Sequence, residues 1–157
     1  MDDSERHDPQ HACDELIRQQ NSLLIASRSV DGAVAISYAP YFRDETGFYI
    51  FISELAQHTQ NLLAQPRASI LFIEPEAAAG NPFARQRLTF DCVVREISKT
   101  HKDYVQKLDA MALKFGEIVG VLRTLPDFHL LVLQPQTGQF VAGFGKAFSV
   151  DSLGRLQ

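Results

Sequence analysis

FARQRLTFDC, residues 83–92, sets the kind of sheet that this chain can form. Apolar and polar residues alternate along it, with Leu88 and Phe90 on either side of Thr89. Successive side chains of an extended chain point to opposite faces, so the apolar set is expected to face a core. The pattern therefore predicts a β-strand over about residues 85–97, with one buried face.

Two arginines, Arg85 and Arg87, open the same stretch and fall on the polar face of the predicted strand. Guanidinium groups bind carboxylates and phosphates through paired hydrogen bonds. The two arginines therefore predict an anion clamp at the mouth of a barrel-like core, for a phosphate or carboxylate ligand.

The composition is that of one globular domain. With 157 residues the chain can bury a core without disulfides or metals. The net charge of −4 argues against nucleic acid as a partner, so any anion site must be local. Cys13 and Cys92 have neither metal-ligand nor redox spacing. His7 and His11 precede Cys13, but we interpret that segment as a solvated arm leading into a helix, and no metal site is predicted.

We expect a flexible N-terminal arm over residues 1–12, one domain over 13–150 and a polar tail over 151–157. Asp8 followed by Pro9 is typical of a helix start. The polar, acidic beginning predicts no signal peptide, and no apolar run reaches the roughly 18 residues of a membrane span. The expectation is a soluble, cytoplasmic protein with no membrane partner.

Hairpins dominate the rest of the pattern. Asp31-Gly32 predicts a hairpin turn, and Pro135–Gly138 predicts another. The mostly antiparallel strands that result are expected to close into a small barrel. Phe48–Ile52 is apolar on both faces, which predicts a central strand or a strand at a homodimer interface. The other expected elements are strands over 22–29, 34–42, 68–73, 128–132 and 139–148, and helices over 57–65 and 100–115.

Catalytic motifs are few. The sequence contains no Walker loop, no Gly-x-Gly-x-x-Gly, no Gly-x-Ser-x-Gly and no His-Glu-x-x-His. Ser53, His58 and Thr59 surround a predicted helix start, where free N–H groups favour phosphate. Plain helix capping is the alternative interpretation. Asp127 and His129 complete the set of polar candidates.

Several segments, in this order and with compatible spacings, resemble the HugZ/HutZ haem-utilisation family. This family lies within the pyridoxamine 5′-phosphate oxidase-like split barrels. The segments are ISYAPY (36–41), FYIFIS (48–53), AQHTQNL (56–62), FARQRLTFD (83–91), KFG (114–116), PDF (126–128) and FVAGFG (140–145).

The resemblance implies a mainly β fold: a six-stranded antiparallel split barrel of the FMN-binding type with flanking helices. It also implies an intertwined homodimer with a cofactor cleft between the protomers. Split barrels of this superfamily often hold FMN in that cleft. The HugZ/HutZ branch binds haem instead, and its members can cleave haem oxidatively to release iron.

The resemblance also implies roles for individual residues. Asp127 looks like the aspartate that reaches across the dimer to hydrogen-bond the proximal histidine, and Arg87 looks like the haem-pocket arginine. These two are the candidate catalytic residues. His58 matches a pocket histidine, while Ser53 and Thr59 fall where flavin-binding relatives hold the FMN phosphate. Together with Arg85 and Arg87, they form the candidate cofactor-binding set.

One departure from the family leaves alternatives open. The haem-binding members carry their axial histidine in a C-terminal extension, and residues 148–157 contain no histidine. His129 is a candidate substitute ligand, against its interpretation as an ordinary strand histidine. Three functions are therefore weighed: a haem-binding and haem-degrading protein, an FMN-binding oxidoreductase or flavin module, and a dimeric remnant without a cofactor.

Overall fold

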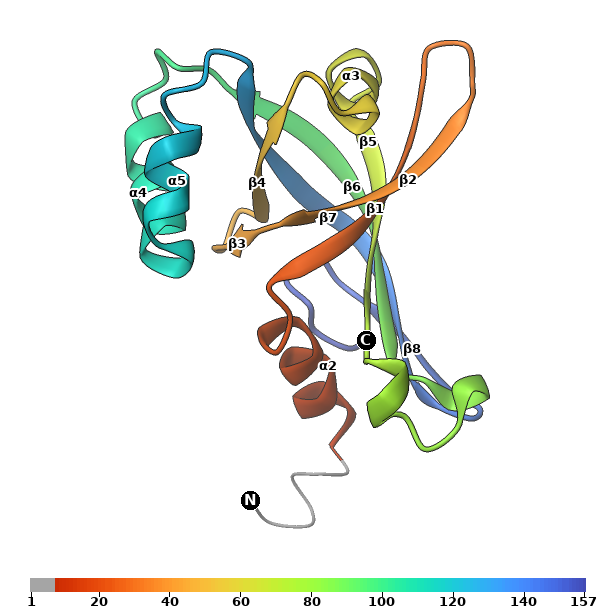
Figure 1. Ribbon diagram of the computed structural model, residues 1–157. Coiled ribbons are helices and arrows are strands. Elements are labelled where there is room, and N and C mark those ends of the chain that lie inside the picture. Colours follow the sequence, from red (N-terminus) through yellow and green to blue (C-terminus); the bar gives the residue numbers. More distant parts are fainter. Residues whose placement is uncertain (1–7) are drawn as a thin grey trace.

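An antiparallel sheet of eight strands dominates the computed structural model, which describes residues 8–157 (Figure 1). The sheet order is β2-β1-β5-β6-β7-β4-β3, with β8 beside β7, and β2 also contacts β4, which closes the sheet around a core. The strands are β1 (Ser22–Arg28), β2 (Val34–Pro40), β3 (Phe42–Arg43), β4 (Phe48–Ser53), β5 (Arg67–Ile73), β6 (Arg87–Ile97), β7 (Phe128–Gly143) and β8 (Lys146–Val150). The α-helices are α2 (Pro9–Arg18), α3 (Gln57–Ala64), α4 (Tyr104–Phe115) and α5 (Glu117–Leu122), and two short 3₁₀ turns span Glu76–Ala78 and Pro82–Ala84.

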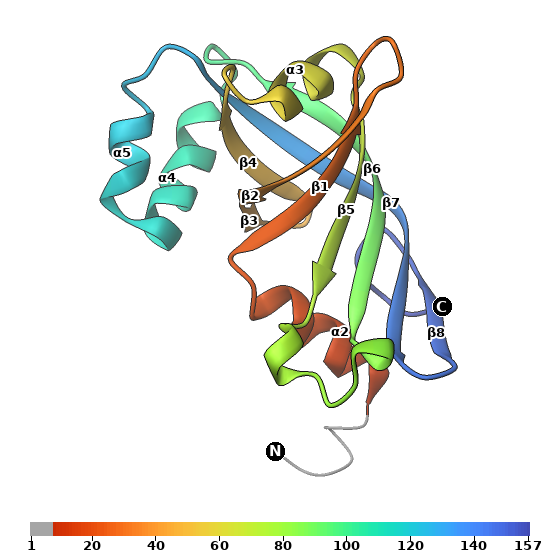
Figure 2. The ribbon, with the colours of Figure 1, turned by 45° about the vertical axis from the view of Figure 1, so that its right-hand side comes forward.

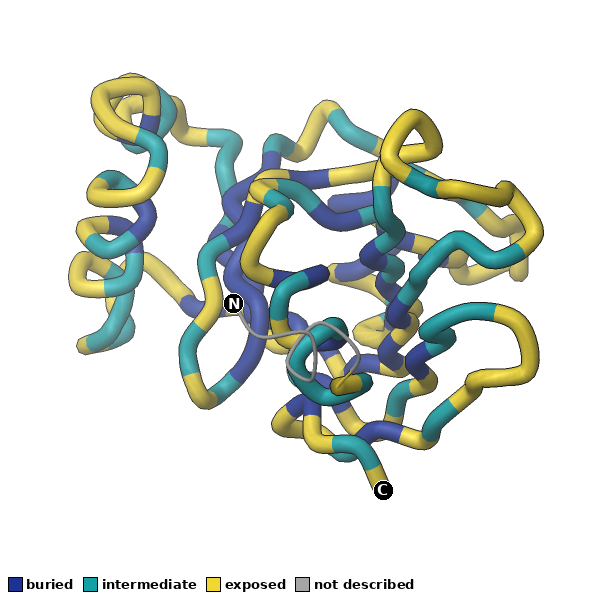
Figure 3. The backbone as a smooth tube through the Cα atoms, turned by 90° about the horizontal axis from the view of Figure 1, so that it is seen from below, coloured by how far each residue is buried: buried dark blue, intermediate teal, exposed yellow. Residues whose placement is uncertain are grey.

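The barrel core is built by alternation, as the pattern of β6 predicts. Leu88, Phe90 and Cys92 are buried, while Thr89 and Asp91 are exposed. Figure 3 shows the buried segments gathered along the strands and the exposed ones at the loops. Helix α2 closes one end of this core with three buried side chains, Cys13, Leu16 and Ile17.

A second core lies on the other face of β4 and β7. Side chains at alternate positions of these strands, such as Tyr49 and Val132, pack against Leu108 and Met111 of α4 and Val119 of α5. Figure 2 shows the α4–α5 pair standing off the barrel on the β4 side. The double-sided apolarity of Phe48–Ile52 is therefore satisfied within one chain, because one face meets the barrel core and the other meets the helices.

The fold departs from the expected strand pattern in three places. The sheet has eight strands and not six. Pro135–Gly138 does not turn the chain but lies inside β7, where the register slips between Asp91 and Cys92. A β-bulge there tolerates the missing N–H of Pro135. The turn comes later, at Gly145 with φ +64, so the expected strand over 139–148 divides into the ends of β7 and β8.

The described parts of the expected arm and tail, residues 8–12 and 151–157, are structured. Residues 1–7 of the expected arm, His7 among them, lie outside the described residues. Residues 9–12 belong to α2, whose N-cap Asp8 accepts a hydrogen bond from the Gln10 N–H at 3.0 Å. The tail returns to the helix, because Leu156 N–H donates to Gln10 Oε1 at 2.8 Å. None of the helices within residues 8–157 is long and apolar enough to cross a membrane.

We expect Tyr41→Phe to lower the free energy of unfolding by about 1–2 kcal/mol. The buried Tyr41 hydroxyl donates to the carbonyl oxygens of Ile17 at 2.6 Å and Gln20 at 2.8 Å, and the variant removes this donor from both. Urea denaturation measures the change. The matched control is Tyr38→Phe, whose ring is 64% exposed and which should change stability by less than about 0.5 kcal/mol. Equal effects of the two substitutions would contradict the role given to Tyr41.

Candidate functional site

Ser53 and Asp127 meet at the end of the sheet where β4 stops and β7 begins. The Ser53 hydroxyl donates to Asp127 Oδ2 at 2.6 Å and accepts from the Leu55 N–H at 3.1 Å. Glu54 N–H donates to the Asp127 carbonyl oxygen at 2.8 Å. Both side chains are part-exposed, so the Asp127 carboxylate is fixed in place while it still faces the surface.

His129, the second residue of β7, lies between two carboxylates. Its Nε2 is 2.6 Å from Glu54 Oε1, and its Nδ1 bonds Glu96. Burial acts to lower the pKa of His129, but the hydrogen bonds to Glu96 and Glu54 outweigh it, so the net pKa is raised. With both ring nitrogens occupied, His129 has no atom free for a metal in this arrangement.

His58 occupies the first turn of α3 and is almost fully buried against β2. Its Nδ1 lies 2.6 Å from the Ser37 hydroxyl. Burial lowers the pKa of this imidazole, which favours its neutral form at neutral pH. The neighbouring Thr59 is 0% exposed, and its Oγ1 has no hydrogen-bond partner among the described residues. These contacts form a polar layer between α3 and the sheet, which Asn61 extends to Ser27 through a 3.1 Å bond.

The two arginines are anchored by main-chain oxygens rather than by carboxylates. Arg85 Nε donates to the Glu74 carbonyl at 2.9 Å, and Arg87 Nη1 donates to the Arg85 carbonyl at 2.9 Å. Neither guanidinium forms an ion pair within residues 8–157. Each has five donors, so both keep charge and hydrogen-bonding capacity for a ligand.

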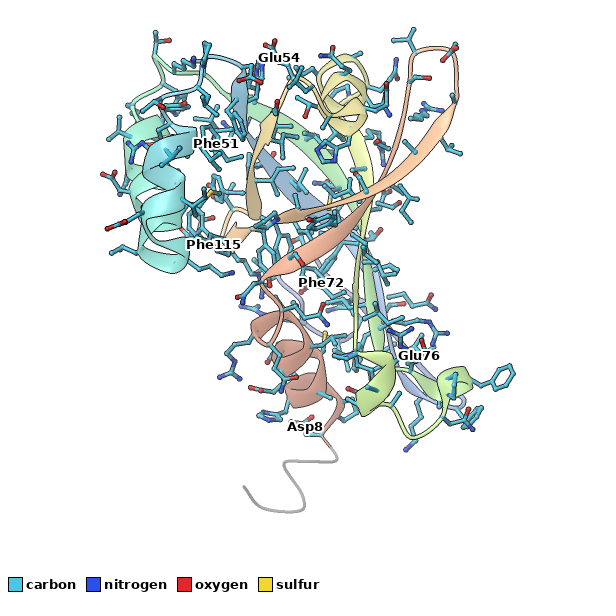
Figure 4. All side chains as sticks on the ribbon, in the orientation of Figure 1. Asp8, Phe51, Glu54, Phe72, Glu76 and Phe115 are labelled. Carbon is cyan, nitrogen blue, oxygen red and sulfur yellow. The ribbon has the colours of Figure 1, made fainter. Side chains whose placement is uncertain are left out.

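The arginines and Asp127 lie at opposite ends of the sheet. Arg87 pairs with Val141 at one end of β6, and Ile97 pairs with Leu130 at the other. Ten residues of strand separate these pairs, about 33 Å at about 3.3 Å per residue. Figure 4 shows the same span: Glu54, next to Ser53, is at the top of the view, and Glu76, in the loop that leads to the arginines, is near the bottom. One chain therefore does not bring the candidate residues together.

The cavity beside the Asp127 corner is small. It measures about 210 Å³ and is lined in part by Glu96, Pro126, Phe128 and His129. Sites for small molecules usually enclose about 300–1,000 Å³. This cavity is therefore smaller than the usual small-molecule site.

An apolar stripe lies on the edge strand β2. Val34, Ile36 and Tyr38 occupy every second position of β2. Their exposed fractions are 85%, 77% and 64%. They lie on the same face, opposite the one that carries Ser37. An exposed apolar edge strand favours pairing with another chain.

Sequence reasoning missed three residues of this site: Ser37, Glu54 and Glu96. The bond between Ser37 and His58 joins positions 21 residues apart. Glu54 and Glu96 pair with His129 across separations of 75 and 33 residues. No local pattern reports such pairs, because they depend on the strand register.

Comparisons with known proteins agree with this architecture. A sequence model of the family described as pyridoxamine 5′-phosphate oxidase matches residues 9–142. The chain is 39% identical over 137 residues to the haem oxygenase HutZ of Vibrio cholerae serotype O1, an alignment that covers 87% of this chain and 78% of HutZ.

Solved structures give the same result. A crystal structure of HutZ, named there as the haem storage protein of Vibrio cholerae, superimposes with a TM-score of 0.76 at 36% identity, over 80% of this chain and 88% of that one. Campylobacter jejuni ChuZ superimposes with a TM-score of 0.82 at 30% identity, over 93% of this chain. The matched region spans 60% of the ChuZ chain.

We expect the two site histidines to titrate on opposite sides of the ordinary histidine pKa of about 6.5. His129 should titrate above it, because Glu54 and Glu96 stabilise the imidazolium, and His58 below it, because burial disfavours the charge. Histidine-selective NMR over pH 5–9 measures both, and Glu96→Gln should lower the pKa of His129 alone.

The raised pKa of His129 also predicts how the free energy of unfolding changes with pH. A raised folded-state pKa contributes stability that is complete below the unfolded value of about 6.5 and is lost as pH rises through the folded value. Urea midpoints should therefore contain a component that falls over that window and that is absent in His129→Gln. A His129 resonance that titrates below 6.5 would contradict the stabilisation of the imidazolium by Glu54 and Glu96.

Proposed function

Because the chain belongs to the pyridoxamine 5′-phosphate oxidase family, we propose that it works as a haem-utilisation protein of the HugZ/HutZ type. It binds haem at a cleft between two copies of the chain and degrades haem oxidatively, which releases iron. The observation that carries this proposal is the 39% identity to the haem oxygenase HutZ over 87% of the chain.

A homodimer is part of the proposal. Arg87 and Asp127 lie roughly 33 Å apart along the sheet, so they can act on one ligand only if different copies supply them. The exposed stripe of Val34, Ile36 and Tyr38 offers an apolar surface for the contact. The distribution of the candidate residues thus supports a dimer, as does the exposed apolar area.

The anionic edge of haem fits the arginine end of the chain. Arg85 and Arg87 form no carboxylate pair among residues 8–157, so they can meet the propionates with charge-assisted hydrogen bonds. Ser53 holds the Asp127 carboxylate towards the surface, where it can accept a hydrogen bond from a donor in the proposed dimer cleft. Haem, as substrate, supplies the iron at which oxygen is activated.

FMN is the second candidate, and one observation favours it. The Thr59 hydroxyl is buried and has no hydrogen-bond partner within residues 8–157. It lies in the first turn of α3, an eight-residue helix, and helix N-termini attract phosphate. The Ser53 hydroxyl is less available to a flavin phosphate, because it already donates to Asp127. Retention of neither cofactor would support the third reading, a dimeric remnant.

The proposal also places the protein in the cytoplasm. Cys13 and Cys92 are free, buried thiols, as expected in a reducing compartment. Burial raises the pKa of Cys13 to about 11 and that of Cys92 to about 12, so neither forms a reactive thiolate at neutral pH.

We expect purified protein to bind hemin, with a shift of the Soret band, and to release iron to a ferrous chelator when a reductant is added. Arg87→Ala should weaken hemin binding by about 1.5–3 kcal/mol, because a charge-assisted contact is lost. Arg95→Ala is the control: Arg95 is an exposed residue of the same strand. Titration followed by absorbance measures both. Unchanged affinity in Arg87→Ala for hemin and for FMN would refute the anion clamp.

Asp127→Ala separates the two cofactors. It should impair the hemin spectrum, because the orienting carboxylate is lost, and should not weaken FMN binding, because it frees the Ser53 hydroxyl for a phosphate. A yellow preparation whose flavin affinity depends on Thr59, with no Soret shift on adding hemin, would favour the FMN candidate instead.

A mixed dimer tests whether two copies share one site. In a dimer of one Arg87→Ala chain and one Asp127→Ala chain, a shared site keeps one intact pair and loses both residues at the other. Tagged heterodimers should therefore bind about half the hemin of wild type at full affinity. Homodimers of either variant should show only weak sites. Two equally weakened sites in the mixed dimer would mean that Arg87 and Asp127 do not act together across the interface.

A further inference from the structure

A second cavity lies where α2, β3 and the end of α4 meet. It has a volume of about 530 Å³, within the range of small-molecule sites. Its lining includes none of the residues assigned to the proposed haem site. The lining residues are Asp14, Ile17, Arg18, Tyr41, Phe42, Arg43 and Lys114.

The charges around this cavity are unbalanced. Three cations, Arg18, Arg43 and Lys114, face one carboxylate, Asp14. Arg18 already pairs with Glu15 on its own helix. Arg43 and Lys114 form no ion pair within residues 8–157, so two positive charges remain without counter-charges.

Lys107 provides an internal comparison for Lys114. The two lysines are seven residues apart on α4, and both direct their ammonium groups over a tyrosine ring on the barrel side. Lys107 Nζ lies 2.7 Å from Asp44 Oδ2, and its pKa is raised, chiefly by that hydrogen bond. Lys114 has no such carboxylate, and burial of its ammonium end lowers its pKa. Lys107 therefore has a carboxylate partner, whereas Lys114 has none within residues 8–157.

The Lys114 ammonium is nevertheless held in a defined position. It donates to the Tyr41 carbonyl oxygen at 2.6 Å and lies 4.1 Å from the Tyr41 ring centroid. An ammonium has three donors, so two remain for a ligand. Figure 4 labels Phe115, the next residue, where the lower end of α4 approaches the barrel.

Arg43 is held from the other side of the cavity. Its Nη2 donates to the Leu153 carbonyl oxygen at 3.2 Å, and its guanidinium carbon lies 5.2 Å from the Phe48 ring centroid. Ile17 and Phe42 line the same cavity as the two cations. The cavity therefore combines positive charge at fixed points with apolar and aromatic side chains.

We propose that this cavity is a second binding site, for a planar aromatic anion. Its phosphate, sulfonate or carboxylate group pairs with Lys114 and Arg43, and its ring lies against Ile17 and Phe42. The site is separate from the proposed haem cleft and does not depend on the function assigned there.

Calorimetric titration of the full chain with 1-naphthyl phosphate tests the proposal. The wild type should bind one probe per protomer. Lys114→Met should weaken binding about tenfold to a hundredfold, because a charge-assisted hydrogen bond is lost. Lys114→Arg should restore most of the affinity. The matched control Lys146→Met, at an exposed position of β8, should change affinity less than about twofold.

Further variants separate this site from the arginine clamp. Arg43→Gln should reproduce the loss seen in Lys114→Met, and Arg87→Ala should leave probe binding unchanged. Thermal melts confirm that each variant is folded. No saturable binding by the wild type, equal binding by wild type and Lys114→Met, or loss of binding in Arg87→Ala would each overturn the proposal. A change of oligomeric state in Lys114→Met with no probe binding by the wild type would also overturn it and identify the cavity as a contact between copies.

Discussion

The strand β7 is the element on which the other parts of the structure depend. Over its 16 residues it pairs with β6 along nearly its whole length, with β4 on its first half and with β8 on its second. Leu131 and Leu133 enter the barrel core, while Leu130 and Val132 meet α4 and α5. One strand therefore joins both cores. It begins directly after Asp127, so the pairing of β7 fixes where that residue lies.

Local pattern predicted the strands well where one face is apolar, as in β6, and it predicted a helix over 100–115, where the structure has α4. It failed at Pro135, where proline and glycine suggested a turn but a bulge keeps the chain in the sheet. Gly138 belongs to the same error. A Cβ there would lie 2.7 Å from the Phe90 ring, so this glycine serves close packing and not a turn.

The sequence predicted which residues belong to the candidate site better than it predicted where they lie in the structure. Ser53 and Asp127 do meet, and His58 is a buried polar residue of α3. What the sequence could not show is distance: Arg87 and Asp127 fall at opposite ends of one sheet, because β6 separates them by its full length. The sequence also could not show that His129 contacts Glu54 and Glu96, since these contacts depend on how the strands pair.

The separation of charge along the sheet bears on how such a fold acquires function. A split barrel can keep its core residues unchanged while cations and carboxylates vary at its two ends, because neither end contributes to the buried alternation of β6. In the dimer proposed above, function arises when a second copy brings the end that carries Arg87 beside the end that carries Asp127. Under this constraint, weakening the dimer contact on β2 should abolish ligand binding even when every candidate residue is intact. The exposed stripe at Ile36 would then be as much a part of the site as the charges themselves.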